Sequence, residues 1–247
     1  MTTSASAAPA VRDDDPADDE GFWDDLLGHV QDGVLIPVTG PGLTTVAVDG
    51  TCRTLSEHIA ARLVAEYGLD VSPRMTMGDA AAAFIRTRGR QRARQLYRIV
   101  SDIIRQVENQ DEPCRSLHDL AAITDLRLFV STTPDRLLAK ALNDVRFGGE
   151  GGTRELTFSL SQSTGEQASN LKASAKSETT VVRLFGEVAS TPQYALHDED
   201  LLEWLRALLT ESERLPGWIA DAIRQQPLLF LGCDIPVSYT HLTLPTN

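Results

Sequence analysis

Cysteine is scarce in this chain of 247 residues, and the placement of its three copies excludes two kinds of stabilising site. Cys52, Cys114 and Cys233 lie far apart, without a CxxC pair and without a histidine at ligand spacing. A structural zinc site needs four ligands, usually in close pairs, so we expect no metal site. We expect no disulfides either.

Long apolar runs and lysine are also rare. No stretch approaches the ~20 apolar residues of a membrane span, and no signal-peptide core follows the first residues. We therefore expect a soluble, cytoplasmic protein without a membrane partner. Lysine provides only three of the 23 basic residues, and the net charge is −12, a balance that disfavours nucleic acid as a partner.

Charge is unevenly distributed along the chain. The first 25 residues contain eight acidic residues and a single arginine, and we predict that residues 1–20 form a disordered acidic tail. A cluster of arginines is either a solvated helix face or a patch that binds phosphate or a partner. These arginines are Arg86, Arg88, Arg90, Arg92, Arg94, Arg98 and Arg105.

Three apolar runs, each followed by a polar turn, are the most informative pattern in the sequence. They lie at 34–45, 128–135 and 228–234, and continuous apolar runs are typical of buried parallel strands. Ligands of open α/β sheets bind beyond the carboxyl ends of the strands, so turns of Gly, Ser, Thr and Asp predict a nucleotide pocket there. Ordinary strand-to-helix turns use the same residues, and this alternative stays open.

The remaining pattern alternates helices with strands. It predicts an α/β fold, a doubly wound, mostly parallel Rossmann-like sheet with helices on both faces, in one domain over residues 21–236. Pro37 is awkward in a central strand and predicts a bulge or a strand start at Val38. Helices are predicted at 22–32, 54–67, 76–107, 116–123, 217–225 and from 198 onward, further strands at 155–160 and 180–184, and an exposed Gly/Ser-rich insertion at 148–178.

Four motifs follow one another in this framework. They are Gly40-Pro41-Gly42-Leu43-Thr44, Ser131-Thr132-Thr133-Pro134-Asp135, Leu184-Phe185-Gly186 before the acidic helix start at 198–200, and Leu231-Gly232-Cys233-Asp234. Their order and spacing resemble the bacterial sirtuin-like (silent information regulator-like) NAD-binding domains of antiphage and immune proteins, over roughly residues 22–236.

The resemblance implies NAD as the cofactor or substrate. It assigns the catalytic positions to Thr133 and Asp135, and the cofactor-binding positions to Gly40, Pro41, Gly42, Leu43, Thr44, Gly232 and Cys233. From the residues alone, the glycines permit either close approach to a pyrophosphate or a plain turn. Asp135 is either a ribose-hydroxyl acceptor or a helix cap.

The chain departs from the family at two positions. The catalytic histidine of the family falls on Phe185 and its asparagine on Thr133; phenylalanine accepts no proton, and threonine lacks the amide. Two functions remain open. One is an NAD-cleaving enzyme of bacterial defence (an NAD⁺ glycohydrolase) that breaks the nicotinamide–ribose bond. The other is a catalytically silent module that senses NAD or ADP-ribose, or provides a scaffold, for a C-terminal effector domain.

The end of the chain differs in character from the rest. Residues 237–247 resemble translated sequencing-adapter read-through, and they share no periodicity with the helices before them. We predict that they are a non-native tail that packs against nothing essential. Besides the nucleotide, the sequence leaves a homo-oligomer open as a partner.

Overall fold

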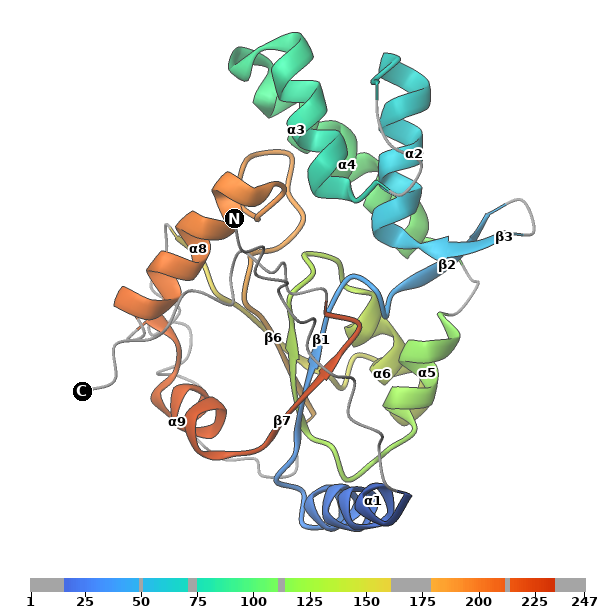
Figure 1. The fold of residues 1–247 in the computed structure, drawn as a ribbon, viewed down its shortest axis with the longest axis vertical. Coiled ribbons are helices and arrows are strands. Elements are labelled where there is room, and N and C mark those ends of the chain that lie inside the picture. Colours follow the sequence, from blue (N-terminus) through green and yellow to red (C-terminus); the bar gives the residue numbers. More distant parts are fainter. Residues whose placement is uncertain are drawn as a thin grey trace, which may run out of the picture.

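The computed structural model describes residues 16–48, 51–70, 75–110, 114–160, 179–211 and 214–233. Within these residues, five parallel strands form one sheet in the order β5-β6-β4-β1-β7 (Figure 1). The predicted α/β fold with a parallel, Rossmann-like sheet is confirmed. The strands are β1 (Ile36–Thr39), β4 (Leu128–Ser131), β5 (Arg154–Thr157), β6 (Thr180–Arg183) and β7 (Leu228–Leu231).

Pro37 fits the central strand β1 without a bulge. β1 begins at Ile36 and pairs along its whole length with β7. Its pairing with β4 on the other side begins only at Val38. The missing N–H of Pro37 therefore precedes the ladder on that side, and the predicted late start applies to the β4 pairing alone.

Helices follow most of the predicted ranges, with two differences. α1 begins at Pro16, so the last five residues of the expected acidic tail are helical; proline is favoured at a first helical position. The helix predicted at 76–107 is broken at Gly89, whose φ is 86°. The helices are α1 (Pro16–Gln31), α2 (Leu55–Tyr67), α3 (Met77–Arg88), η1 (Arg90–Arg92), α4 (Ala93–Glu108), α5 (Arg115–Ala121), α6 (Leu137–Phe147), α8 (Asp198–Thr210) and α9 (Gly217–Gln225).

A short antiparallel hairpin was missed by the sequence analysis. β2 (Thr45–Val48) pairs with β3 (Thr51–Thr54) directly after the first strand-end turn. The hairpin leads into α2, where Thr54 and Glu57 form a reciprocal capping box.

The strand predicted at 155–160, within the insertion at 148–178, is present as β5, which begins at Arg154 and ends at Thr157. It is an edge strand of the sheet, and Leu156 and Phe158 are buried, at 5% and 0% exposed. Apolar side chains at alternate positions made this segment a strand, although its flanks are rich in glycine. Residues 161–178 of the insertion, residues 1–15 of the acidic tail and the whole of 237–247 lie outside the described residues.

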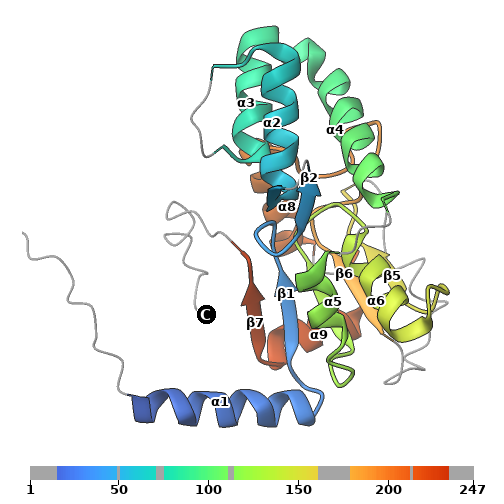
Figure 2. The ribbon, with the colours of Figure 1, turned by 90° about the vertical axis from the view of Figure 1, so that its right-hand side faces the viewer.

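Both faces of the sheet are covered. On β6, Val181 belongs to the large core cluster shared with α2–α6, whereas Val182 packs with Trp204 of α8 and Ile219 of α9. α2, α3 and α4 stand beyond the carboxyl ends of the strands, and α1 crosses at the opposite, amino end (Figure 2). The two ends of the sheet therefore have very different surroundings.

Candidate functional site

The three strand-end turns lie side by side, as their sequence pattern predicted. After β1, Gly40 N donates to Leu231 O at 2.9 Å, and Gly42 N donates to Gly232 O at 2.8 Å. After β4, Thr132 N donates to Thr39 O at 2.9 Å. The turns after β1, β4 and β7 therefore form one continuous edge beneath α2 and α3 (Figure 1).

Gly40 and Gly232 are required because the two turns that contain them pack closely together. A Cβ on Gly40 would lie 2.5 Å from Gly232 O, and a Cβ on Gly232 would lie 2.3 Å from Leu43 N. Gly232 also has a φ of +63°, which other residues rarely adopt. Close packing of two turns explains both glycines without a ligand.

The backbone donors of residues 40–43 in the first loop are already occupied. Gly40 N and Gly42 N bond to the turn after β7, Leu43 N bonds to Gly40 O at 3.1 Å, and Pro41 has no N–H. A phosphate cradle needs free N–H groups. In this conformation the loop offers instead the exposed surface of Pro41 and Gly42, while Thr44 is buried at 4% exposed.

Asp135 is both a helix cap and an unsatisfied acceptor. It is 4% exposed, and its Oδ1 accepts from Leu137 N at 3.0 Å, at the start of α6. Its Oδ2 is buried without a hydrogen-bond partner among the described residues. Burial raises the pKa of Asp135, although the nearby Thr133 hydroxyl, the Leu137 N–H and the charge of Arg183 oppose the rise. The Asp135 carboxylate therefore keeps one buried oxygen without a hydrogen bond at this edge.

The other two side chains of this edge, Thr133 and Cys233, are half-buried. Thr133 N donates to Ser131 Oγ at 3.2 Å, which shapes the turn after β4. The Sγ of Cys233 lies 3.4 Å from Val38 O, and burial raises the pKa of this thiol. A thiol that is protonated at neutral pH is a poor nucleophile, so its position favours packing over chemistry.

A buried arginine next to Asp135 was missed by the sequence analysis. Arg183, at the end of β6, is 1% exposed; its guanidinium contacts Glu155 at 2.5 Å and Glu187 at 3.2 Å. Arg136 bridges the same two glutamates from the surface, at 3.3 and 3.2 Å. In the sequence, the signal for this arginine is a single charged residue near the end of the apolar run 180–184, which we interpreted as an ordinary strand.

A second carboxyl group adjoins this network from α4. Glu108 accepts from Arg136 N at 2.7 Å. Burial raises its pKa, and the charge of Asp135 adds to the rise, whereas the Arg136 N–H bond lowers it. At the carboxyl edge, two carboxyl groups with raised pKa values thus lie near a buried guanidinium. Such an arrangement is common at functional sites and also in structural ion networks.

Phe185 lies two residues after the end of β6. Its side chain packs against the cluster that contains Val182 and Trp204 of α8. Arg183, two residues earlier, contributes the side chain that lies near Asp135. Phe185 therefore cannot do the work of the histidine that the resembling family has at this position, because its ring accepts no proton and packs in an apolar cluster.

The space left at the edge is small. A cavity of about 20 Å³ is bounded by Pro41, Thr44, Thr133 and Asp135 below and by apolar side chains of α2, α3 and α4 above. Sites for drug-sized ligands enclose roughly 300–1,000 Å³. The apolar side chains that close this cavity are Leu55, Ile59, Met77 and Ile104.

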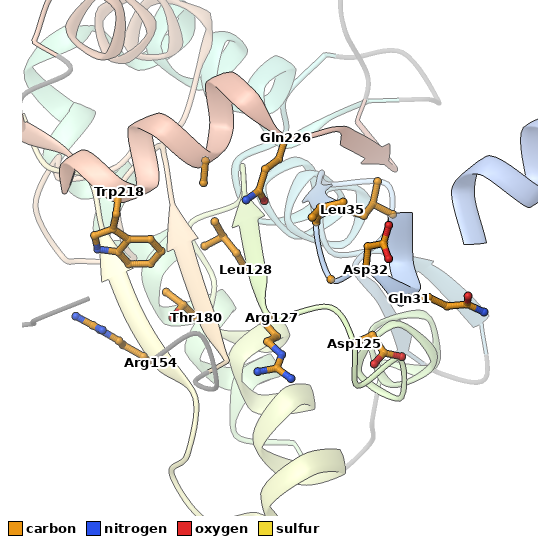
Figure 3. A pocket seen from close by; sticks show the side chains of 13 residues that line it. Gln31, Asp32, Leu35, Asp125, Arg127, Leu128, Arg154, Thr180, Trp218 and Gln226 are labelled. Carbon is orange, nitrogen blue, oxygen red and sulfur yellow. The ribbon is translucent and has the colours of Figure 1, made fainter. Parts of the chain in front are cut away.

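A much larger cavity lies at the other end of the sheet. It encloses about 570 Å³ beside the amino ends of β1, β4 and β6. Figure 3 shows Trp218 and Arg154 at one end of it and Asp32 and Asp125 at the other. Because the predicted site residues are all at the carboxyl edge, none of them lines this cavity.

Comparison with protein-family models and with curated proteins gave no match to the chain. The sirtuin-like resemblance therefore stays a prediction that rests on the four motifs. Across the described part of the chain, no group of three or more metal-ligating side chains is present. No helix within the described ranges is long and apolar enough to span a membrane.

Proposed function

We propose that this chain is a nucleotide-binding α/β domain that takes NAD, or a related ADP-ribose nucleotide, at the carboxyl edge of β1, β4 and β7. The observation that carries the proposal is the unpartnered Oδ2 of Asp135, buried where three strand-end turns converge. Ribose hydroxyl groups are donors that would satisfy such an acceptor. The hydroxyl of Thr133 lies next to it as a second polar group.

We propose further that the domain binds the nucleotide without cleaving it. Cleavage of the nicotinamide–ribose bond in the resembling family uses a histidine base, and Phe185 packs toward α8 instead. Asp135 has one oxygen engaged by Leu137 N, where it caps α6, so we assign it the role of an acceptor for the nucleotide. The role that fits is a sensing or scaffolding module within a bacterial defence protein.

Binding at this edge requires α2 and α3 to move away from the sheet. The cavity beneath them has room for about one water molecule, so the nucleotide must displace Leu55, Ile59 and Met77. These helices are joined to the sheet through the short β2–β3 hairpin. We therefore expect NAD to bind a more open arrangement of α2 and α3, with an affinity reduced by the free energy of opening.

The test is calorimetric titration of NAD and of ADP-ribose into the chain, with parallel measurement of released nicotinamide. Asp135→Asn keeps the oxygen that caps α6 and replaces the unpaired acceptor by a donor. Losing a hydrogen bond to a charged group typically removes about 1.5–3 kcal/mol, so we expect Kd to rise about tenfold or more.

The matched control is Asp119→Asn on the surface of α5, where the side chain is 75% exposed. It should leave Kd unchanged. Equal affinities for the wild type and Asp135→Asn would show that this carboxylate is not part of a nucleotide site. Release of nicotinamide by the wild type would favour the NAD-cleaving alternative.

A further inference from the structure

The outer edge of β7 is open. β7 is the last strand in the sheet order and pairs only with β1 among the described residues. Ile36 N donates to Pro227 O at 3.0 Å and Gly40 N to Leu231 O at 2.9 Å, so alternate residues of β7 point toward β1. The N–H and C=O groups of Leu228 and Phe230 therefore point outward, where they can pair with another strand.

This edge has none of the usual protection against pairing. β7 has the sequence Leu-Leu-Phe-Leu, without charge or proline, and Phe230 is 54% exposed. The opposite edge strand, β5, carries Arg154 and Glu155 and is covered by the ion pairs of Glu155. Soluble proteins normally guard exposed edges with charges, so the contrast marks β7 as a surface that is covered in the working protein.

α1 extends the same apolar surface. It lies at the amino ends of the strands and projects past β7 on its open side (Figures 1 and 2). Phe22, Trp23 and Leu27 on this helix are 56%, 58% and 53% exposed. The strand edge and the projecting helix together form an L-shaped surface.

We propose that this surface binds a second copy of the chain, with the two β7 strands paired antiparallel about a two-fold axis. Such pairing is self-complementary, because Leu228 of one copy faces Phe230 of the second, and both residues present their N–H and C=O groups outward. The two sheets become one continuous sheet, and no open β7 edge remains.

The two-fold arrangement also gives α1 a binding site. Because the strands of the two copies run in opposite directions, the amino end of one sheet lies level with the carboxyl end of the other. α1 of each copy therefore reaches the foot of α2 in the second copy, beside the Gly40–Thr44 loop. The partner helix thus lies next to the candidate nucleotide site.

Charge identifies this occupant as a second copy of the chain. α1 contains no lysine or arginine, and its Asp24 and Asp25 are exposed. The part of α2 up to Arg62 and the strand before it carry two arginines, Arg53 and Arg62, against the single acidic Glu57 of the first turn, so this surface has a net positive charge. The chain therefore carries both an acidic projecting helix and the basic surface that the helix meets across the two-fold axis.

The experiment is sedimentation equilibrium of the full chain over a range of concentrations. We expect the wild type to be a dimer of twice 26.9 kDa. Phe230→Lys, which adds a charge to the open edge, should raise the dimer Kd at least tenfold. Leu209→Lys on α8 changes an equally exposed apolar residue (65%) away from the edge, and it should keep the wild-type Kd. A monomeric wild type, or equal effects of the two variants, would overturn the proposal.

A charge reversal tests the α1 contact separately. Replacing Asp24 and Asp25 by lysine should weaken the dimer, and adding Arg53→Glu and Arg62→Glu to the same chain should restore it. Restoration needs the two charge groups to meet across the interface, which a merely folded monomer would not show. A combined variant that dimerises no better than the Asp24/Asp25 pair alone would contradict this contact.

Discussion

The glycine at the end of β7 allows the packing of the strand-end turns to be measured as a free energy. Gly232 has a φ of +63°, and an added Cβ would lie 2.3 Å from Leu43 N and 2.8 Å from the carbonyl carbon of Gly42. Both contacts are with backbone atoms, which cannot rotate away. Gly232→Ala must therefore either distort its own backbone or push the 40–43 loop off the turn.

The chain contains a control for the backbone term alone. Gly68 ends α2 with a φ of +62°, and nothing lies within 4 Å of its added Cβ. Gly68→Ala should therefore cost only the left-handed conformation, about 1–2 kcal/mol. Gly232→Ala should cost that amount plus the loss of the hydrogen bonds from Gly40 N and Gly42 N, each worth about 0.5–1.5 kcal/mol. The expected total is about 2–5 kcal/mol.

The assay is urea unfolding of both variants and the wild type, monitored by circular dichroism. A third variant, Gly28→Ala in the open middle of α1, should be neutral or stabilising by up to about 1 kcal/mol, since alanine favours helices. If Gly232→Ala costs no more than Gly68→Ala, the turns are not held by their mutual contact. The left-handed backbone conformation of Gly232 would then be the whole reason for the glycine.

Four further variants test the electrostatics and the position of Phe185. Asp135→Asn should stabilise the fold increasingly as pH rises above about 4. Burial raises the pKa of Asp135 in the folded state, so its ionisation costs stability at pH values above its unfolded pKa. Urea unfolding of the wild type and the variant at pH 4 and at pH 8 measures this effect. A stability difference that does not grow with pH would contradict this sign. Arg183→Met should cost about 3–5 kcal/mol by leaving Glu155 without its buried partner, whereas the more exposed Arg136→Met should cost at most about 1 kcal/mol in the same assay. Equal costs would show that the buried ion pair is not structural. Phe185→His should lower the melting temperature without producing nicotinamide from NAD, because the side chain packs toward α8; appearance of nicotinamide would show that it reaches the site.

The strands and their common edge could be predicted because each has a strong local signal. Buried parallel strands are continuous apolar runs, and the carboxyl ends of neighbouring parallel strands meet at one edge whatever the details of packing. Thr54 and Gly68 likewise mark the ends of α2, where the structure has a capping box and a left-handed cap. These features depend on a few adjacent residues.

The features that were missed are either very short or depend on contacts between distant residues. The β2–β3 hairpin is four residues per strand, too short for its alternation to stand out beside the glycines before it. The burial of Arg183 depends on Glu155 and Glu187 from other segments. The occupied amides of the 40–43 loop depend on the turn after β7, nearly 190 residues away in the chain. Sequence patterns place such loops at an edge, but they do not reveal which donors remain free.

Nucleotide binding without cleavage is tested most directly by one titration of NAD into the full chain, followed by proton nuclear magnetic resonance. Saturation transfer from the protein to NAD reports binding, and the separate signals of free nicotinamide report cleavage in the same tube. We expect saturation transfer to the ribose protons, its loss in Asp135→Asn, and nicotinamide at the level of protein-free buffer. No saturation transfer at millimolar NAD, or steady accumulation of nicotinamide, would contradict the account.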